Sequence, residues 1–542
     1  MLKLYTSQLK KAKTAPLQLS ELARIIYQIL LVTALISLRW LLDGNMGSVN
    51  EVDVLPLALQ HIDPTWILGD WYLNQPAGYR LLFETFAGHL ILAWGFLGTS
   101  IVGRLACYGL VASGLVLIGQ TIKLRLPLLL LAVALFIIND DQGAVATEWI
   151  VKGFEAKSIA YGFVLLGIWS MLEHHYRRMA FMLGVATSFH ILVGGWSFLI
   201  VIGYLVFHYR SYLKLFPHLG WLVGIYCTAS IFAVQPVLAQ LSDNIPTHSI
   251  SPSLIYVFLR LPHHLNPLSW SLKWLRFIAY LTALIVSVRS LQRQTALSGS
   301  TNLAQIELFH FTLISLVPCL LGLLVAPFDS QGSLLQFYPF RVGDVILPLN
   351  TYLLAGCALQ SQASNTKWQK MLRPASLSFL AILMTLQAAQ LPAQFLALRQ
   401  FPNLDPALKE FYSWVQMQTP RTATIISPPV EFVEFTRLTE RPTIVKYKLL
   451  PQTKAGILGW YQRLGDLNGG SFPELKRLRT KDNREHIKQA LTQNYYKLKT
   501  PQVKTLMRVY QADYFMTLAT QRLKLPVAYR NGQYILYSRQ DI

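Results

Sequence analysis

The chain has 542 residues, of which 53% are hydrophobic and only 14% are charged, and its formal net charge is +21. A soluble globular protein carries charge on about a quarter of its residues, so this composition excludes an ordinary soluble enzyme. The basic excess comes without an RNA-binding motif or an aromatic and basic stripe, which argues against nucleic acid as a partner. A positive-inside bias and an attraction to membrane lipids with anionic headgroups explain the charge more simply.

The hydrophobic residues form long blocks, which is typical of a polytopic α-helical membrane protein. A helix needs about 20 residues to cross the hydrocarbon core. The first block, 22–42, lacks a small-residue cleavage pattern, and we interpret it as a retained anchor. The candidate apolar segments are 22–42, 82–98, 100–121, 125–139, 158–172, 179–207, 216–236, 271–288, 306–326, 341–360 and 374–391.

Basic residues in short loops set the predicted orientation, because they favour the cytoplasmic side. They are Lys123, Arg125, Arg177, Arg178, Arg210, Lys214, Arg289, Arg293, Lys367, Lys370 and Arg373. The loops that then face outward are 43–78, 139–157, 237–270 and 327–340. The segment 79–98 should lie along the outer interface, and 179–207 should form a short helix pair with Gly194-Gly195 near its tip. The sequence thus predicts about eleven crossings, with the N-terminus in the cytoplasm and the C-terminus outside.

The long apolar segments end before Pro392, and the composition of the sequence changes after it. We expect a GT-C-like membrane domain over 1–395, a linker over 396–404 and a soluble α/β domain over 405–542 on the outer, periplasmic side of a bacterial plasma membrane. The predicted elements of that last domain are helices at 405–418, 483–496 and 501–511 and strands at 422–427, 443–447, 513–518 and 532–538. It carries no P-loop or dinucleotide fingerprint. The four cysteines are scattered through apolar runs, so we interpret them as small core residues.

Acidic residues gather in the first outer loop of an otherwise basic chain. Asp53 is the preferred catalytic residue, because a carboxylate beside the membrane can accept a proton from a hydroxyl or hold a divalent ion. Glu51 and Asp70 are supporting candidates in the same loop. The alternative is that these acids are solvated turn residues, and that Gly69-Asp70-Trp71 is a turn with an interfacial tryptophan.

The second outer loop supplies further acids and a lysine. Asp140, Asp141, Glu148 and Glu155 form a possible second acidic group, and Lys157 pairs with them or holds a lipid phosphate. Glu148 and Glu155 are seven residues apart and share a face if helical. The alternative is a set of local ion pairs on a polar loop.

Three basic residues in later outer loops are candidates for phosphate binding. Arg341 begins a membrane helix, and its guanidinium matches phosphate geometry with paired hydrogen bonds. Arg260 and His263 could contribute from the loop before it. The alternative for Arg341 is snorkelling to lipid headgroups. His190, near the tip of the short helix pair, is expected to be buried and neutral because charge inside a membrane is costly.

These motifs together resemble the start of the GT-C glycosyltransferases, polytopic enzymes that use polyprenyl-phosphate sugars. The resemblance rests on Asp53, Gly69-Asp70-Trp71, the stretch Tyr79–Gly98 with Arg104-Leu105, Gly153-Phe154-Glu155-Ala156-Lys157-Ser158, Phe189-His190, and Trp414, Thr419-Pro420 and Ser427-Pro428-Pro429. The layout of the whole chain is similar to a bacterial group of GT-C-like membrane proteins described as a domain of unknown function. One departure is that Glu51-x-Asp53 replaces the usual adjacent acidic pair, which leaves the identity of the base open.

The resemblance implies an enzyme that moves a sugar from a polyprenyl-phosphate donor to an acceptor at the outer membrane face. Asp53 would be the base, and Arg341 would bind the donor phosphate. Some members of the class use a divalent cation such as Mg²⁺ or Mn²⁺ and others do not. The alternatives are a lipid or solute transporter or flippase, whose path intramembrane charges would mark, and a non-catalytic envelope membrane protein.

Overall fold

The computed structural model describes residues 19–42, 50–76, 78–208, 212–242, 250–298, 302–362, 367–399, 404–470, 472, 479 and 482–539. The N-terminal lysines, Asp43 and Arg210 lie outside these ranges, as do residues 400–403 of the predicted linker. Residues 396–399, which begin that predicted linker, are helical instead and end α18.

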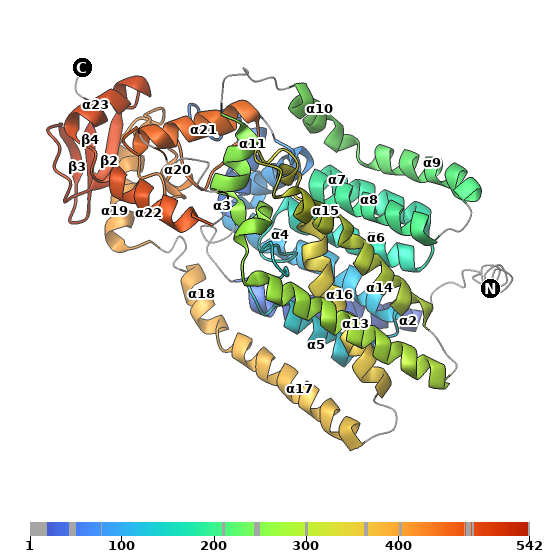
Figure 1. Cartoon of the computed structure of the whole chain (residues 1–542). Coiled ribbons are helices and arrows are strands. Elements are labelled where there is room, and N and C mark those ends of the chain that lie inside the picture. Colours follow the sequence, from blue (N-terminus) through green and yellow to red (C-terminus); the bar gives the residue numbers. More distant parts are fainter. Residues whose placement is uncertain are drawn as a thin grey trace.

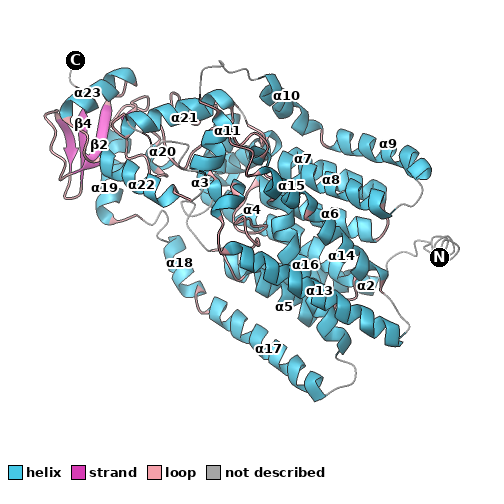
Figure 2. Ribbon diagram, viewed as in Figure 1, coloured by secondary structure: helices cyan, strands magenta, loops and turns pink. Residues whose placement is uncertain are grey.

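The described residues form a helical bundle with a small sheet at one end (Figures 1 and 2). The helices of the bundle are α2 (Leu19–Trp40), α3 (Glu51–Ile62), α4 (Leu81–Thr121), α5 (Leu126–Ile137), α6 (Ala156–Leu172), α7 (Tyr176–Phe189), α8 (Ile191–His208), α9 (Tyr212–Ala229), α10 (Val234–Ser242), α11 (Pro252–Leu254), α12 (Pro262–Leu265), α13 (Lys273–Ser298), α14 (Leu303–Ser315), α15 (Val317–Val325), α16 (Arg341–Gln362), α17 (Lys367–Ala388) and α18 (Leu391–Arg399). Short helical turns lie at Ile231–Ala233, Ile255–Arg260, Pro267–Ser269 and Leu335–Phe337.

Several of these helices are long and apolar enough to cross a membrane. Seven qualify by length and composition in the described part of the chain, or eight if the pair His218–Ala229 and Ile231–Gln240, bent by 65°, is one span. Helices α5 and α6 are apolar but have only 12 and 17 residues. At 1.5 Å per residue they are about 18 and 25 Å long, shorter than the hydrocarbon core. The eleven crossings therefore stay a prediction.

Two breaks divide apolar stretches near one end of the bundle. Gly95 has φ 68° and ψ 177°, which interrupts α4 at a residue type that tolerates this backbone. The interfacial segment predicted over 79–98 is thus set off from the helix that follows. A second break falls at His190, whose extended backbone separates α7 from α8. The chain therefore changes direction at His190, four residues before the predicted Gly194-Gly195 tip.

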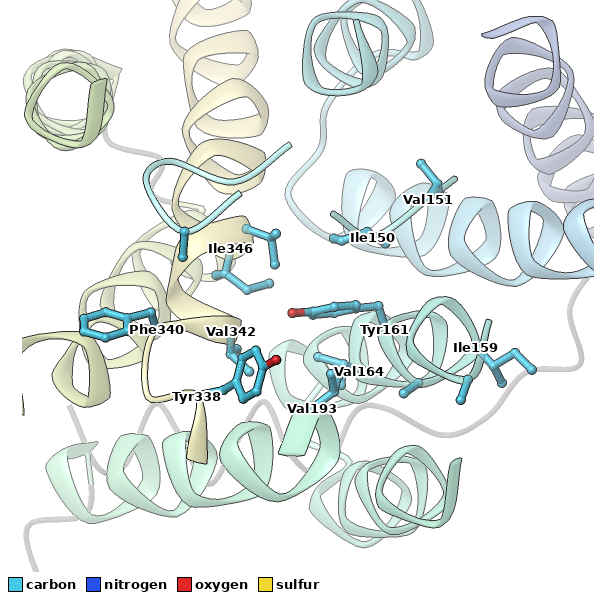
Figure 3. Packing of buried hydrophobic residues seen from close by; sticks show 14 of the residues in the cluster. Ile150, Val151, Ile159, Tyr161, Val164, Val193, Tyr338, Phe340, Val342 and Ile346 are labelled. Carbon is cyan, nitrogen blue, oxygen red and sulfur yellow. The ribbon is translucent and has the colours of Figure 1, made fainter. Parts of the chain in front are cut away.

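Among the candidate membrane spans of the described residues, α16 is the most enclosed, with 83% of its apolar window buried. Figure 3 shows its first turns, at Val342 and Ile346, facing the aromatic ring of Tyr161 from α6. The Tyr161 hydroxyl donates a hydrogen bond of 3.0 Å to the backbone carbonyl of Arg341. This packing fixes the start of α16, and therefore the position of the Arg341 side chain.

The C-terminal part combines short helices with a four-stranded sheet. Its helices are α19 (Pro406–Gln418), α20 (Phe435–Thr439), α21 (Lys454–Leu467), α22 (Arg484–Tyr495) and α23 (Thr500–Val509), and its strands are β1 (Ile425–Ile426), β2 (Tyr514–Leu518), β3 (Val527–Arg530) and β4 (Tyr534–Ser538). The strand order is β1-β2-β4-β3, with β1 and β2 parallel and the other pairs antiparallel. The strand expected at 443–447 is reduced to one bridge between Thr443 and Ile425. Helix α21 and strand β3 were not predicted.

The C-terminal part packs directly on the first loop of the bundle. The buried Asp70 carboxylate accepts hydrogen bonds from the backbone N–H groups of Tyr72, Leu73 and Thr443, at 2.8–3.0 Å. Trp71 in turn donates its backbone N–H to the Thr443 carbonyl at 3.2 Å. Since buried polar groups are costly when unpaired, these hydrogen bonds hold the two parts of the chain together.

Candidate ligand-binding site

The end of the bundle next to the C-terminal part contains a cavity of about 480 Å³. Its walls come from all four loops that the charge pattern predicts to lie on one side, and from the C-terminal part. The lining residues are Asn50, Asp53, Val54, Tyr79, Arg80, Asp141, Thr147, Trp149, Glu155, Ala156, Lys157, His190, Tyr256, Arg260, Leu261, His263, His264, Lys273, Tyr338, Arg341, Lys448, Leu450, Pro451, Gln452 and Arg484. We call this space the cationic cavity.

The irregular loop 139–155 is shaped by two buried side chains. The Asp344 carboxylate accepts the backbone N–H groups of Val145 and Ala146, at 2.6 and 2.9 Å. Gly143 passes so close that a Cβ there would lie 1.9 Å from Asp344 Oδ2, so only glycine fits. The Gln142 side chain holds the end of this loop. Its Oε1 accepts the backbone N–H groups of Ile150 and Val151, and its Nε2 donates to the Val151 carbonyl. These hydrogen bonds position Glu148, which lies in the same loop, behind the cavity wall.

Glu148 is buried behind that wall, where several basic side chains meet its carboxylate. Its carboxylate receives the Nε of Arg341 at 3.2 Å and the Nζ of Lys157 at 3.3 Å, and His264 lies 3.6 Å away. Burial alone raises the pKa of Glu148, but these three groups outweigh that effect and lower the pKa to about 2. Glu148 is therefore ionised at neutral pH and holds the two cations in place.

Arg341 reaches from Glu148 into the cavity. Its Nη1 lies 3.1 Å from His190 Nε2, and its guanidinium stacks 3.6 Å from the centre of the Tyr338 ring. Arginine only donates, so His190 Nε2 must accept, and the His190 ring is not the doubly protonated imidazolium. No hydrogen bond joins the Nη2 of Arg341 to any residue that the structure describes, although this side chain is only 6% exposed. That donor is available to a ligand.

Asp53 faces the same cavity from the first turn of α3. The Tyr72 hydroxyl donates to its Oδ1, and Arg80 Nη1 lies 3.8 Å from its Oδ2. Arg80 is 8% exposed, and its other charged neighbour, Glu84, is 3.9 Å from its Nε. Both separations exceed hydrogen-bond distance, so the buried Arg80 guanidinium makes no hydrogen bond within the described ranges.

Unpaired polar atoms recur on this wall. Four lining residues have a buried side-chain atom without a hydrogen-bond partner among the described residues. These atoms are Arg80 Nε, Trp149 Nε1, Glu155 Oε1 and His263 Nδ1. Buried polar atoms are almost always paired in folded proteins, so a concentration of unpaired ones marks a surface built to meet a ligand or water.

The charge of the lining is strongly unequal. Seven cations face three carboxylates, and the cations are Arg80, Lys157, Arg260, Lys273, Lys448, Arg484 and Arg341. Carboxylates behind the wall, such as Glu148 and Asp482, balance part of this charge without lining the cavity. A ligand in the cavity therefore meets mainly positive charge, and an anionic group is the chemistry that fits.

Three acids that the sequence offers as candidates lie elsewhere. Glu51 is fully buried and makes paired hydrogen bonds of 2.7 and 2.8 Å with Arg104. Asp70 accepts a hydrogen bond from the backbone N–H of Thr443 and so attaches the C-terminal part to the bundle. Asp140 is exposed and pairs with Arg39 at 3.0 Å. None of these three acids lines the cationic cavity, and their observed contacts are structural.

Of the other candidates, Glu148 lies behind the wall, and the rest line the cavity, several of them with a structural role as well. Glu155 accepts a hydrogen bond from Asn50 at 3.2 Å, which ties the first two loops together. Arg260 donates to the backbone carbonyls of Tyr447 and Lys448 at 3.1 and 3.0 Å, which positions the C-terminal wall. Burial lowers the pKa of His263 well below its usual range, so this imidazole is neutral. Asp141 also lines the cavity.

Sequence reasoning missed the cations that come from outside the predicted loops. Arg80 sits at the start of the interfacial stretch, and Lys273 begins α13. Lys448 and Arg484 come from the C-terminal part. Arg80 carried the only usable signal, a lone cation on an apolar stretch. Lys448 and Arg484 reach the cavity only through a tertiary contact, which no local sequence pattern reports.

A metal site is not evident from the side chains. Among the described residues, no group of three or more His, Cys, Asp or Glu side chains is arranged to hold a metal ion. Asp53, the proposed acid of the first loop, has Arg80 and Tyr72 as its neighbours. The donor set does not fit a divalent cation, which usually needs several oxygen ligands.

Comparison with known proteins touches only a small part of the chain. The family model of a domain of unknown function, DUF6798, matches residues 406–467. No curated protein shows significant similarity to the chain. The matched stretch runs from α19 to the end of α21 and contains four residues of the cavity wall, Lys448, Leu450, Pro451 and Gln452.

Proposed function

We propose that this protein is a membrane glycosyltransferase of the GT-C kind, which moves a sugar from a polyprenyl-phosphate donor to an acceptor hydroxyl. The observation that carries the proposal is the position of Asp53 in the same cavity as Arg341 and Arg80. A carboxylate beside unpaired guanidinium donors supplies the two things that such a transfer needs, a proton acceptor and a site for the departing phosphate.

In the proposed reaction, Asp53 accepts the proton of the acceptor hydroxyl. The acceptor oxygen then attacks the anomeric carbon of the donor sugar, and the bond from that carbon to the phosphate oxygen breaks. The electron pair leaves with the phosphate, whose negative charge Arg341 and Arg80 stabilise. The polyprenyl phosphate and the new glycoside are the products, and no metal takes part in these steps.

The proposed orientation places the cationic cavity at the outer membrane face, with the N-terminus in the cytoplasm. The donor reaches it sideways from the bilayer, which keeps the polyprenyl chain in lipid. The apolar helices, the positive-inside pattern and the gathering of the four predicted outer loops support this arrangement. The eleven crossings and the periplasmic position of residues 405–542 belong to the same proposal.

Membranes that contain the protein provide the test. They are supplied with polyprenyl-phosphate sugars that carry a radiolabel, and transfer of the label to endogenous acceptors is measured. The Asp53→Asn variant should abolish transfer, whereas Asp140→Asn, a change at an exposed acid outside the cavity, should leave it intact. Unchanged transfer by Asp53→Asn would contradict the assignment of the base.

A further inference from the structure

A second cavity, of about 250 Å³, adjoins the cationic cavity. Its lining residues are Leu57, Gln60, His61, Pro64, Tyr72, Leu73, Asn74, Gln75, Pro76, Gly78, Glu84, Pro451 and Gln452. Pro451 and Gln452 line both cavities, so the two spaces share a wall. None of the described lining residues is a lysine or an arginine. We call this space the amide cavity, after its four Asn and Gln side chains.

The boundary between the two cavities is built from the reacting groups of the proposed site. Tyr72 lines the amide cavity, and its hydroxyl donates to Asp53 on the cationic side. Glu84 lines the amide cavity and lies 3.9 Å from Arg80 on the cationic side. A ligand in the amide cavity therefore lies next to the proposed base and next to the proposed phosphate site.

Glu84 is an unpartnered acceptor in this wall. The residue is only 3% exposed, and neither of its carboxylate oxygens makes a hydrogen bond to any residue in the described ranges. The oxygens of a carboxyl group accept hydrogen bonds in either protonation state. A buried carboxylate without donors is costly, so the residue calls for donor groups from a ligand.

The neighbours of Glu84 offer uncharged hydrogen bonding. Thr85 donates its hydroxyl to the Leu81 carbonyl at 2.9 Å, so His61 Nε2 must donate to Thr85 at 3.2 Å. His61 Nδ1 makes no hydrogen bond to any residue that the structure describes. Gln75 uses its Nε2 on the Trp71 carbonyl, and Gln452 uses its Oε1 on the backbone N–H of Tyr79. Each of these amides keeps its other polar atom for a ligand.

We infer that the amide cavity binds a neutral polyhydroxylated ligand, a sugar or polyol, and that this ligand is the acceptor of the proposed transfer. Hydroxyl groups supply the donors that Glu84 and His61 lack, and they accept from the amide N–H groups. The lining disfavours a phosphorylated ligand, because its described residues include a carboxylate and no lysine or arginine. The role as acceptor rests on the proposed function, whereas the binding of a neutral sugar does not.

Direct binding tests the inference with the full-length protein in lipid nanodiscs. Saturation-transfer NMR with methyl α-mannopyranoside and methyl β-glucopyranoside should show contact, and glucose 6-phosphate should not compete. The Glu84→Gln variant should weaken glycoside binding about tenfold or more, because a hydrogen bond to a charged group is among the stronger ones. Glu307→Gln is the matched control, since Glu307 is also a buried carboxylate, 4% exposed, on α14 outside both cavities.

Two further results keep the outcomes distinct. If Glu84→Gln does not fold, Gln75→Leu on the same wall replaces it and should also weaken binding. Glycosides that fail to bind the wild-type protein, or that bind both wall variants as tightly as the wild type, overturn the amide cavity as a sugar site. Glycosides that bind while labelled sugar transfer is absent leave the sugar site standing and overturn the proposed enzyme instead.

Discussion

The cationic cavity and the amide cavity share a wall but have opposite electrostatic character. The cationic cavity has seven lysine and arginine side chains in its lining, whereas the described lining residues of the amide cavity include no lysine or arginine and contain the buried Glu84. The two linings fit two different chemistries, an anionic group on one side and hydroxyl groups on the other. Asp53 and Arg80 stand at the boundary, which is where a transfer between the two ligands would take place.

The largest predicted effect tests whether that boundary is catalytic. Asp53→Asn should lower sugar transfer by about 10²- to 10⁴-fold, the usual contribution of a positioned general base. Binding of polyprenyl phosphate should be retained, because the guanidinium groups are unchanged. Transfer assays and lipid-binding assays on the same membranes separate these effects. Loss of lipid binding together with transfer would mean that Asp53 organises the cavity rather than accepting a proton.

A second prediction concerns the acid next to that base in the sequence. Arg104→Leu should destabilise the protein by about 3–5 kcal/mol, because it leaves the buried Glu51 carboxylate without its charged partner. The exposed pair of Arg39 and Asp140 is the matched control, and Arg39→Gln should cost less than about 1 kcal/mol. Thermal unfolding in detergent compares the two variants. Equal effects would contradict the structural role assigned to Glu51.

A third prediction uses the pH dependence of the cationic cavity. Burial lowers the pKa of His264 from its ordinary value of 6.5 to about 4, although Glu148 partly opposes this effect. The unfolded chain therefore takes up a proton first as the pH falls below 6.5, and the folded protein loses stability until about pH 4. The loss from this residue is about 3 to 4 kcal/mol at most, since one pKa unit corresponds to about 1.4 kcal/mol.

Unfolding temperatures measured from pH 7.5 to 4 check this dependence. His264→Asn should flatten the curve, because the amide replaces the imidazole and does not titrate. Glu148 contributes in a different window. Its pKa of about 2 lies below its ordinary value of 4.5, so its stabilising effect is lost only as the pH falls below that ordinary value toward 2. A curve that is identical with and without His264 would remove this residue as the cause.

The smallest predicted effect separates the cavities by salt. Raising the ionic strength from about 0.1 to 1 M shortens the Debye length from about 10 to 3 Å. Polyprenyl phosphate should bind the cationic cavity several-fold more weakly at high salt, whereas methyl glycosides should bind the amide cavity equally well. Titrations of both ligands at the two salt concentrations measure the difference. Equal salt dependence for the two ligands would erase the distinction between the cavities.

The sequence predicted the helices of the bundle well because their apolar periodicity is local. It also predicted the position of Asp53, Glu155, Lys157 and Arg341 on loops that meet, since basic residues in short loops indicate which loops share a side. The site cations Lys448 and Arg484 could not be found this way. They reach the cavity only because the C-terminal part packs on the bundle, through contacts such as that of Asp70 with Thr443.

Composition was also a poor guide to the role of individual acids. Glu51 and Asp53 are two residues apart, and a two-residue step on a helix points them in different directions. One is paired with Arg104 in the core and the other lines the cavity. In the sequence, Glu84 indicates only that the stretch 79–98 is amphipathic, because a single acid in an apolar stretch does not predict a site. Its importance comes from its burial and from its missing partners.

A structure of the protein in lipid nanodiscs with polyprenyl phosphate tests the central claim most directly. We expect density for the phosphate inside the cationic cavity, within hydrogen-bond distance of the Arg341 and Arg80 guanidinium groups, with the polyprenyl chain leading out to the bilayer. The same experiment with Arg341→Gln should show weaker phosphate density. Phosphate density located outside the cavity, or unchanged by Arg341→Gln, would contradict the assignment of this cavity as the donor site.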